Sequence, residues 1–214
     1  MRERIEVLLE MSMVGMWVGT FHAICHRILR VHYKEAFLPA AFQILDANDQ
    51  YRLIKKIMKA LDIDEDKWSS KTAQWYINAK KEEGLGPEDI KTNKDETERQ
   101  LLHIYTEYEE ACKKSGLVDF AGLLLKTLML LKENEHILSK YQDRFQYILV
   151  DEFQDTNALQ YKWLCLLSNQ HVPVFAVGDD DQSIYRWRGA KIENIHNFSK
   201  DFENVKTYKL EQNY

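Results

Sequence analysis

The chain has 214 residues, of which 45% are hydrophobic and 12% aromatic, enough material for one large domain or two small ones. Its formal charge of −5 and pI near 5.8 argue against indiscriminate binding to nucleic acid, because affinity for a phosphate backbone comes chiefly from cations. The sequence has three scattered cysteines, no apolar run near the roughly 20 residues that span a bilayer and no signal-peptide pattern. It therefore predicts a cytoplasmic protein with no membrane partner, no disulfide framework and no cysteine metal site.

The first predicted element is a helix over residues 20–34. Apolar residues recur there at helical spacing from Phe21 to Leu29. The segment TFHA would lie where this helix begins, with backbone amides free for an anion. Cationic side chains follow within two turns, at Arg27 and Arg30, so a local track for nucleic acid is compatible with the negative net charge.

The next part of the chain, residues 39–115, is predicted to be a small helical insertion. Two apolar stripes run through it, one from Leu53 to Leu61 and another from Leu101 to Cys112. The only competing signal is a short strand from Phe42 to Leu45. The acidic runs DIDED and KDETE are typical of solvated faces.

From residue 116 to residue 214, strands and helices alternate. We expect, in chain order, a helix over 120–132, a strand over 145–150, a helix over 157–168, a strand over 173–178 and a strand over 205–210. This alternation, with apolar strands, implies a parallel sheet. The predicted fold class is therefore α/β, with its core formed by residues 1–38 and 116–214 around the helical insertion.

The segment FQYILVDEFQDT, which begins at Phe145, combines an apolar strand with two adjacent carboxylates. Such a strand, covered on both faces, would deliver Asp151 and Glu152 to its carboxyl end, where open α/β sheets bind ligands. A nucleotide triphosphatase needs one carboxylate to hold Mg²⁺ and a second group to activate water. Asp151 suits the first role and Glu152 the second, although a DE pair by itself more often only opens a loop.

The segment VFAVGDDDQSIYRWRGA, residues 174–190, repeats this pattern. Its strand also ends in carboxylates and then a glutamine, Gln182, as Gln154 follows the first strand. We therefore expect neighbouring strands whose ends converge on one phosphate. Beyond Gln182, aromatic and cationic residues alternate from Tyr185 to Arg188, which suits stacked single-stranded bases. A core aromatic cluster flanked by solvated arginines is the alternative.

These segments resemble motifs II and III of the superfamily 1 DNA helicases of the UvrD/Rep/PcrA type. LEQNY at 210–214 resembles the opening of motif IV, and TFHAICHRIL at 20–29 resembles the TFHS segment of that family. VDFAGLL at 118–124 resembles a block written DFDDLL, with Ala121 and Gly122 in place of its second and third acids. The resemblance implies an incomplete RecA-like, P-loop motor core, domain 1A, with residues 39–115 as the all-helical subdomain 1B.

The resemblance also implies two cofactors, ATP and Mg²⁺, and a role for each residue around them. Asp151 would bind the metal and Glu152 would be the catalytic base. Gln154 and Asp179 would also belong to the nucleotide site. Gln182 would contact the γ-phosphate, Arg188 would tie the nucleotide to the DNA track, and Tyr214 would stack on adenine.

The implied partners are single-stranded and duplex DNA, with repair or replication proteins as further candidates. Thr20, Phe21 and His22 would contact the DNA backbone. Tyr185 and Trp187 would line the single-strand track. The activity implied for the parent protein is ATP-dependent movement along single-stranded DNA in the 3′ to 5′ direction, with unwinding of the duplex.

The chain contains no phosphate-binding loop of the form GxxxxGK[ST]. Its eight glycines are scattered, and the close pair Gly84 and Gly86 belongs to a polar turn. We therefore expect an internal fragment of a longer motor, without the N-terminal portion and the second motor domain, and with negligible ATPase activity alone. A helicase–nuclease of the RecB or AddA kind is an alternative, although Asp181 stands where those relatives usually carry lysine. A non-catalytic module that binds DNA or protein is another.

Overall fold

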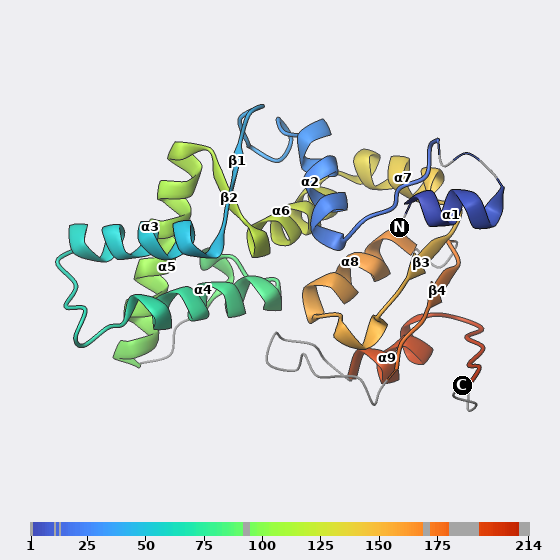
Figure 1. The fold of residues 1–214 in the computed structure, drawn as a ribbon. Helices are drawn as coiled ribbons and strands as arrows, with labels where there is room; N and C mark the ends of the chain where they lie inside the picture. Colours follow the sequence, from blue (N-terminus) through green and yellow to red (C-terminus); the bar gives the residue numbers. More distant parts are fainter. Residues whose placement is uncertain are drawn as a thin grey trace.

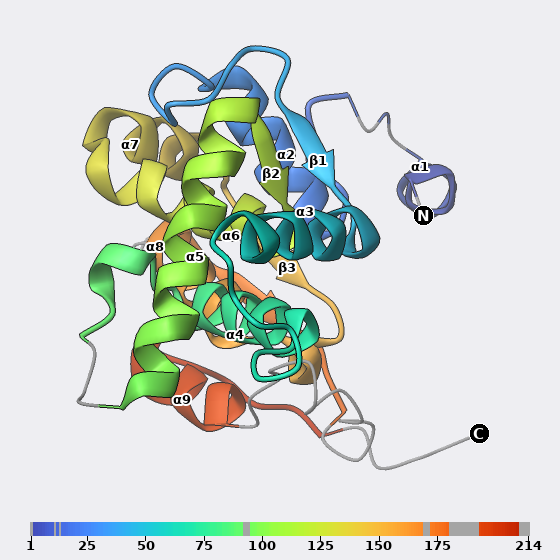
Figure 2. The ribbon, with the colours of Figure 1, turned by 90° about the vertical axis from the view of Figure 1, so that its left-hand side faces the viewer.

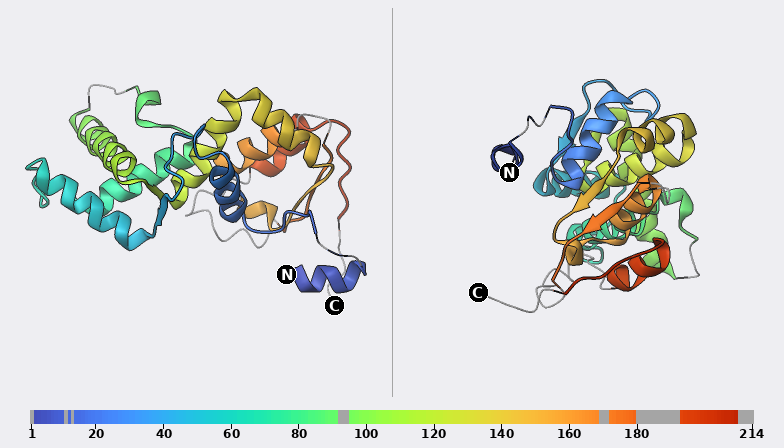
Figure 3. Two further views of the ribbon diagram at one scale, coloured as in Figure 1. Left: turned by 90° about the horizontal axis from the view of Figure 1, so that it is seen from above. Right: turned by 90° about the vertical axis from the view of Figure 1, so that its right-hand side faces the viewer.

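The computed structural model describes residues 2–10, 12, 14–91, 95–168, 172–179 and 193–209. Its elements in chain order are α1 (Arg2–Leu9), α2 (Phe21–Val31), β1 (Gln43–Leu45), α3 (Ala47–Ala60), α4 (Ser70–Glu83), the 3₁₀ turn η1 (Pro87–Asp89), α5 (Glu96–Ser115), β2 (Leu117–Asp119), α6 (Phe120–Glu133), α7 (Glu135–Arg144), β3 (Ile148–Val150), the 3₁₀ turn η2 (Phe153–Asp155), α8 (Ala158–Ser168), β4 (Val174–Ala176) and α9 (Glu193–Asp201). Figure 1 shows a helical part, formed by α3, α4 and α5, beside a mixed part that holds β3 and β4. Helix α1 stands away from both parts in Figures 2 and 3.

Local chemistry sets many of the helix boundaries. A side-chain oxygen accepts a hydrogen bond from a backbone N–H at the start of α2, α3, α4, α5 and α6, and the capping residues are Thr20, Asp46, Ser69, Asp95 and Asp119. Helices α4 and α5 end at Gly84 and Gly116, whose φ angles of 84° and 64° lie in the left-handed region that favours glycine. Polar residues therefore begin these helices, and glycines end two of them.

The helical part is built on the two apolar stripes that the sequence predicts. Ile54 and Met58 of α3 are buried against Ile104, Tyr105 and other residues of α5. In Figure 2, α5 runs at a steep angle to α3 and α4 and lies to one side of them. The hydrophobic surface removed from water, more than intrinsic helix propensity, holds these helices together.

The expectation of an all-helical insertion is wrong at residues 43–45. Strand β1 pairs in parallel with β2, with Ile44 opposite Val118. The extended backbone has a packing reason, since it lets Phe42 join the core of the mixed part while Leu45 joins the core of the helical part. A helix would direct these two side chains, three residues apart, to the same side.

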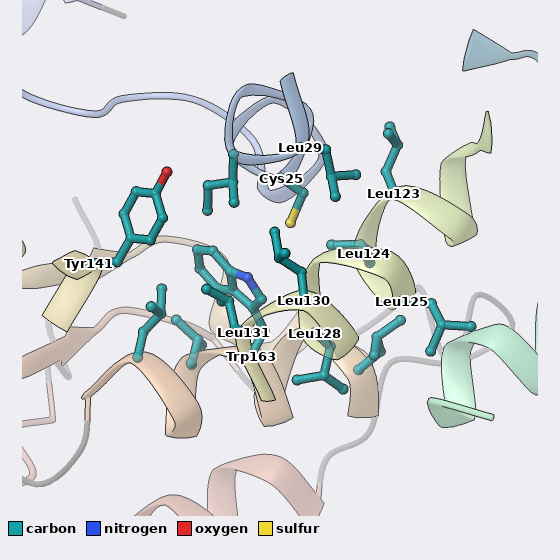
Figure 4. Close-up of a cluster of buried hydrophobic side chains, with 14 of the residues drawn as sticks. Cys25, Leu29, Leu123, Leu124, Leu125, Leu128, Leu130, Leu131, Tyr141 and Trp163 are labelled. Atoms are coloured by element: carbon teal, nitrogen blue, oxygen red, sulfur yellow. The ribbon is translucent and has the colours of Figure 1, made fainter. Parts of the chain in front are cut away.

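The core of the mixed part surrounds α6, the most apolar helix. Its leucines are buried on every side, as expected for a helix covered all round. Figure 4 shows Cys25 and Leu29 of α2, Tyr141 of α7 and Trp163 of α8 converging on Leu124, Leu130 and Leu131 of α6. The helix predicted over 120–132 is therefore confirmed, with one further residue at its end.

Strands β3 and β4 pair in parallel, with Leu149 opposite Phe175, as the sequence predicts. The expected burial of both faces is wrong for the described residues. Val150 is buried against the core, whereas Leu149 and Phe175 are 76% and 62% exposed. Side chains alternate between the faces of a strand, and the described helices cover one face only.

Three further elements differ from expectation or lie outside it. Residues 205–209 form no strand, so that prediction is wrong there, because no described strand pairs with this segment. Helices α7 and α9 were not predicted, although Ile137 and Tyr141 of α7 show the helical spacing of buried residues.

Within the described residues, no helix has the length and apolar character needed to cross a membrane.

Candidate active site

The candidate site lies at the carboxyl ends of β3 and β4. The ladder between the strands continues past β3, because Val177 N donates to Val150 O and Phe153 N donates to Val177 O, each at 2.8 Å. The structure thereby brings the segment from Asp151 to Gln154 beside Gly178 and Asp179. Both Asp151 and Glu152 are exposed at this edge, in the position where parallel sheets bind ligands.

The chain makes a tight turn at Glu152. Its backbone is left-handed, with φ 51° and ψ 44°. This conformation costs a residue with a side chain about 1–2 kcal/mol. The turn is held by hydrogen bonds from Glu152 N to Asp151 Oδ1 at 3.0 Å, from Asp155 N to Glu152 O at 2.9 Å and from Thr156 Oγ1 to Phe153 O at 2.7 Å. The turn therefore presents the two carboxylates on a fixed backbone.

Gln154 joins the two strand ends from inside the protein. It is 1% exposed. Its Nε2 donates to Glu152 Oε2 at 2.7 Å, and its Oε1 accepts from Asp179 N at 3.0 Å. The side chain that was predicted to contact the cofactor is thus hydrogen-bonded within the site at both ends of its amide.

Asp155 adds another carboxylate, near that of Glu152. Its Oδ1 is buried and has no hydrogen-bond partner among the described residues. Burial and the neighbouring Glu152 carboxylate raise the pKa of the Asp155 carboxyl. An uncompensated buried oxygen beside a second acid favours a nearby cation.

These acids suit a magnesium ion that keeps most of its water. No three metal-ligating side chains converge anywhere in the described part of the chain. Mg²⁺ commonly binds proteins through one or two carboxylates and completes its octahedron with water and phosphate oxygens. The exposed Asp151 carboxylate fits that requirement.

Helix α9 fixes the far end of the same turn. The Asn194 side chain is buried, and its Nδ2 donates to Thr156 O at 2.9 Å. Tyr161 of α8 donates to Asp201 Oδ2 at 2.7 Å, near the end of α9. The sequence gives no signal for these contacts, because a single asparagine in a polar segment has no periodic pattern.

Several predicted site residues lie outside the described residues. They are Gln182, Tyr185, Trp187, Arg188 and Tyr214. The structure places only the start of that segment, at Asp179, and the helix that follows it, α9.

The TFHA segment starts α2, as expected. Thr20 is exposed, and its Oγ1 accepts from Ala23 N at 3.2 Å. Phe21 instead points into the core, with its ring 5.7 Å from that of Trp163. His22 packs edge-on against Phe120, and burial lowers its pKa, so the ring is neutral at pH 7.

Arg30 is occupied by structural contacts. Its Nη1 donates to Ala40 O and its Nη2 to Phe42 O, each at 2.8 Å, and the guanidinium lies over the Phe42 ring. Arg27 similarly covers the ring of Trp17, at 4.1 Å from the centroid. Arg27 and Arg30, which follow TFHA in the sequence, thus make contacts that stabilise the fold.

Replacing Thr20 by alanine is expected to lower the free energy of unfolding by about 1 kcal/mol, because the first turn of α2 loses its capping oxygen. Urea unfolding of this chain measures the difference. Thr20→Ser retains the hydroxyl and should stay close to wild type. Equal stability of the alanine variant and wild type would show that the cap contributes nothing.

Comparison with known proteins gives a consistent match. The family described as the UvrD/REP helicase N-terminal domain matches residues 1–203. DNA helicase II of Escherichia coli is 52% identical over 214 residues, which cover 100% of this chain and 30% of that protein. ATP-dependent DNA helicase PcrA of Bacillus subtilis is 38% identical over 215 residues, covering 100% of this chain and 29% of that protein. The chain thus spans less than a third of the length of these curated relatives.

Proposed function

Because this chain belongs to the UvrD/REP helicase N-terminal domain family, we propose that it forms part of the motor of an ATP-dependent DNA helicase. The motor would hydrolyse ATP to move 3′ to 5′ along single-stranded DNA and unwind duplex DNA, in repair or replication. The observation that carries the proposal is the junction of the two strand ends, where Gln154 links the exposed Glu152 carboxylate to the backbone of Asp179. We further propose that residues 1–38 and 116–214 form domain 1A and residues 39–115 form subdomain 1B.

In this proposal the two exposed acids have separate roles. Asp151 would hold Mg²⁺, which when bound offsets the negative charge of the phosphates. Glu152 would orient a water molecule and accept its proton while the new bond from water oxygen to the γ-phosphorus forms and the bond to the ADP oxygen breaks. The fixed turn limits the positions that this carboxylate can take, since its backbone and one carboxylate oxygen are both held.

The DNA-facing role of TFHA would depend on hydrogen bonds rather than on charge. Thr20 and the first amides of α2 are placed where a phosphate can accept from them. His22 is neutral at pH 7, and Arg30 is bound to backbone carbonyls. Such contacts position a nucleic acid without reading its sequence. We propose that Tyr185 and Trp187 stack on the bases, and that Gln182, Arg188 and Tyr214 complete the nucleotide site.

ATP hydrolysis and DNA binding should be linked in the complete helicase, the full-length polypeptide that carries this chain. We expect ATP hydrolysis that requires Mg²⁺ and rises when single-stranded DNA is added. Trp187→Ala should weaken single-stranded DNA binding at fixed salt by about 1–3 kcal/mol, the usual worth of one stacked base. Titration of labelled oligonucleotide measures the loss.

Trp75 offers a matched control for the stacking assignment. It is a tryptophan on α4 that is 71% exposed, and Trp75→Ala should leave single-stranded DNA binding unchanged. A rate of ATP hydrolysis that does not change when single-stranded DNA is added would contradict the motor proposal. Equal losses from both tryptophan variants would contradict the assigned track. We also propose that the 214-residue chain alone has negligible ATPase activity, because its sequence contains no GxxxxGK[ST] loop.

A further inference from the structure

We propose that Gln154 is a positioning residue, whose buried amide fixes the Glu152 carboxylate and the Asp179 backbone relative to each other. The inference rests on the proposed function, because it assumes that Glu152 is the proton acceptor. It goes beyond that function by assigning Gln154 a role other than contact with the cofactor. The ends of β3 and β4 would then form one rigid unit with the catalytic carboxylate.

The two hydrogen bonds of Gln154 determine which way its amide points. A carboxylate only accepts hydrogen bonds and a backbone N–H only donates them. The NH₂ group must therefore face Glu152 Oε2, and the carbonyl must face Asp179 N, as the distances of 2.7 Å and 3.0 Å place them. The reverse orientation would bring oxygen against oxygen and donor against donor.

Burial supports an indirect role. At 1% exposure, Gln154 offers no free surface to a nucleotide in solution. Within the described residues, Gln154 is also the hydrogen-bond donor to the Glu152 side chain. Loss of this contact would free the carboxylate to rotate away from the water that it must orient.

Gly178 allows the strands to approach closely enough for this link. A Cβ atom built at Gly178 would lie 2.7 Å from Gln154 Oε1 and 3.2 Å from Gln154 N. Both distances are shorter than ordinary van der Waals contact, and one is to backbone, so a side chain there would push the amide away from Asp179. The glycine and the glutamine act together, because one makes the space in which the other bonds.

The first test is Gln154→Ala in the complete helicase. We expect kcat for DNA-stimulated ATP hydrolysis to fall on the order of 10–100-fold, the usual effect of removing a group that orients a functional ligand. KM for ATP should change by about twofold or less, because Gln154 does not reach the substrate. A direct cofactor ligand would instead raise KM.

Asn194→Ala is the matched control. Asn194 is also a buried amide that donates to the same turn, at Thr156 O, but it does not touch Glu152. Both variants should lower the melting temperature, and only Gln154→Ala should lower kcat strongly. An equal fall in kcat from the two variants would overturn the positioning role, since general loosening of the turn would then explain it.

Gln154→Glu gives a second, independent readout. As a carboxylate the new group would repel Glu152, but once protonated its O–H can donate to Glu152 while its carbonyl still accepts from Asp179 N. The neighbouring acids Glu152 and Asp155 favour the protonated form. We expect kcat relative to wild type to recover as pH falls, about tenfold per pH unit while the pH stays above the pKa of the coupled carboxyls.

Gln154→Ala should show no such recovery. Parallel pH profiles for the alanine and glutamate variants would refute the inference. If Gln154→Ala is too unstable to purify, Gln154→Glu decides the question against wild type alone, because a relative kcat that does not recover as pH falls would also refute the inference. A wild-type complete helicase without DNA-stimulated hydrolysis would instead contradict the proposed function, so the two failures are distinguishable.

Discussion

Replacement of Glu152 by glutamine is expected to lower kcat for ATP hydrolysis by the complete helicase on the order of 10²–10⁴-fold, the usual contribution of a positioned proton acceptor. The amide has nearly the same shape but cannot take the proton of the attacking water. ATP binding should persist, because the phosphates would be held by other groups. Steady-state kinetics with saturating single-stranded DNA measure the effect.

The stability of this variant should stay close to wild type. Glu152 is exposed, and exposed substitutions usually change stability by about 0.5 kcal/mol or less. Glu203→Gln, at an exposed acid beyond α9, is the matched control and should retain full activity. Unchanged hydrolysis in Glu152→Gln would show that the assigned base is wrong.

Replacement of Lys81 by alanine is expected to destabilise the chain by about 3–5 kcal/mol, because it leaves the buried Asp119 carboxylate without its cation. Lys81 and Asp119 are 2% and 3% exposed, and Lys81 Nζ lies 2.5 Å from Asp119 Oδ2 and 2.6 Å from Glu109 Oε1. Tyr108 also donates to Asp119 Oδ2, at 2.6 Å. Urea unfolding monitored by circular dichroism measures the loss.

The adjacent residue Lys80 provides the control. Its ion pair with Glu83 is partly exposed, at 3.2 Å, and Lys80→Ala should cost less than about 1 kcal/mol. Similar losses from the two alanine variants would show that the buried cluster has no special weight in the fold.

The Lys81 variant should also change how stability depends on pH. Burial alone would raise the pKa of the Asp119 carboxyl, but Lys81 outweighs it and holds that pKa below its usual range. This contribution is therefore present above the unfolded pKa near 3.9 and is lost as pH falls through the folded pKa. Without Lys81, burial dominates and protonation of Asp119 becomes favourable. The gap in unfolding free energy between wild type and Lys81→Ala should then narrow from pH 7 towards pH 4.

The contribution of Lys81 to stability does not change with pH across the neutral range. Burial alone would lower the pKa of the Lys81 ammonium, but Asp119 and Glu109 hold it above its usual value. Its contribution is complete below the unfolded pKa near 10.4 and declines only as pH rises through the folded pKa. The contributions of Lys81 and Asp119 to wild-type stability should therefore stay constant between roughly pH 5 and 10.

The sequence predicts those features that local pattern determines. Apolar spacing predicts α6, and the polar TFHA start predicts the beginning of α2. The apolar run before Asp151 predicts a strand, and two similar segments predict the parallel pair. A continuous apolar run does not reveal which face is covered, and Leu149 is exposed here although its neighbour Val150 is buried.

Contacts between distant residues could not be predicted in this way. Lys81 and Asp119 are 38 positions apart, and Asn194 and Thr156 are also 38 positions apart. A charged residue in a polar helix is typical of a solvated face, so nothing marks Lys81 as buried before the fold is known. For Gln154, the motif gives the residue type but not the direction of its amide, which depends on the register of two strands.

The left-handed backbone at Glu152 sets the needs of folding against those of catalysis. Glycine adopts this conformation without the strain that any side chain brings, so a chain selected for stability alone would carry glycine at position 152. Glycine would also remove the proposed proton acceptor. The fold thus tolerates a standing strain at its proposed catalytic position, and further stabilisation of this turn by sequence change would come at the cost of turnover.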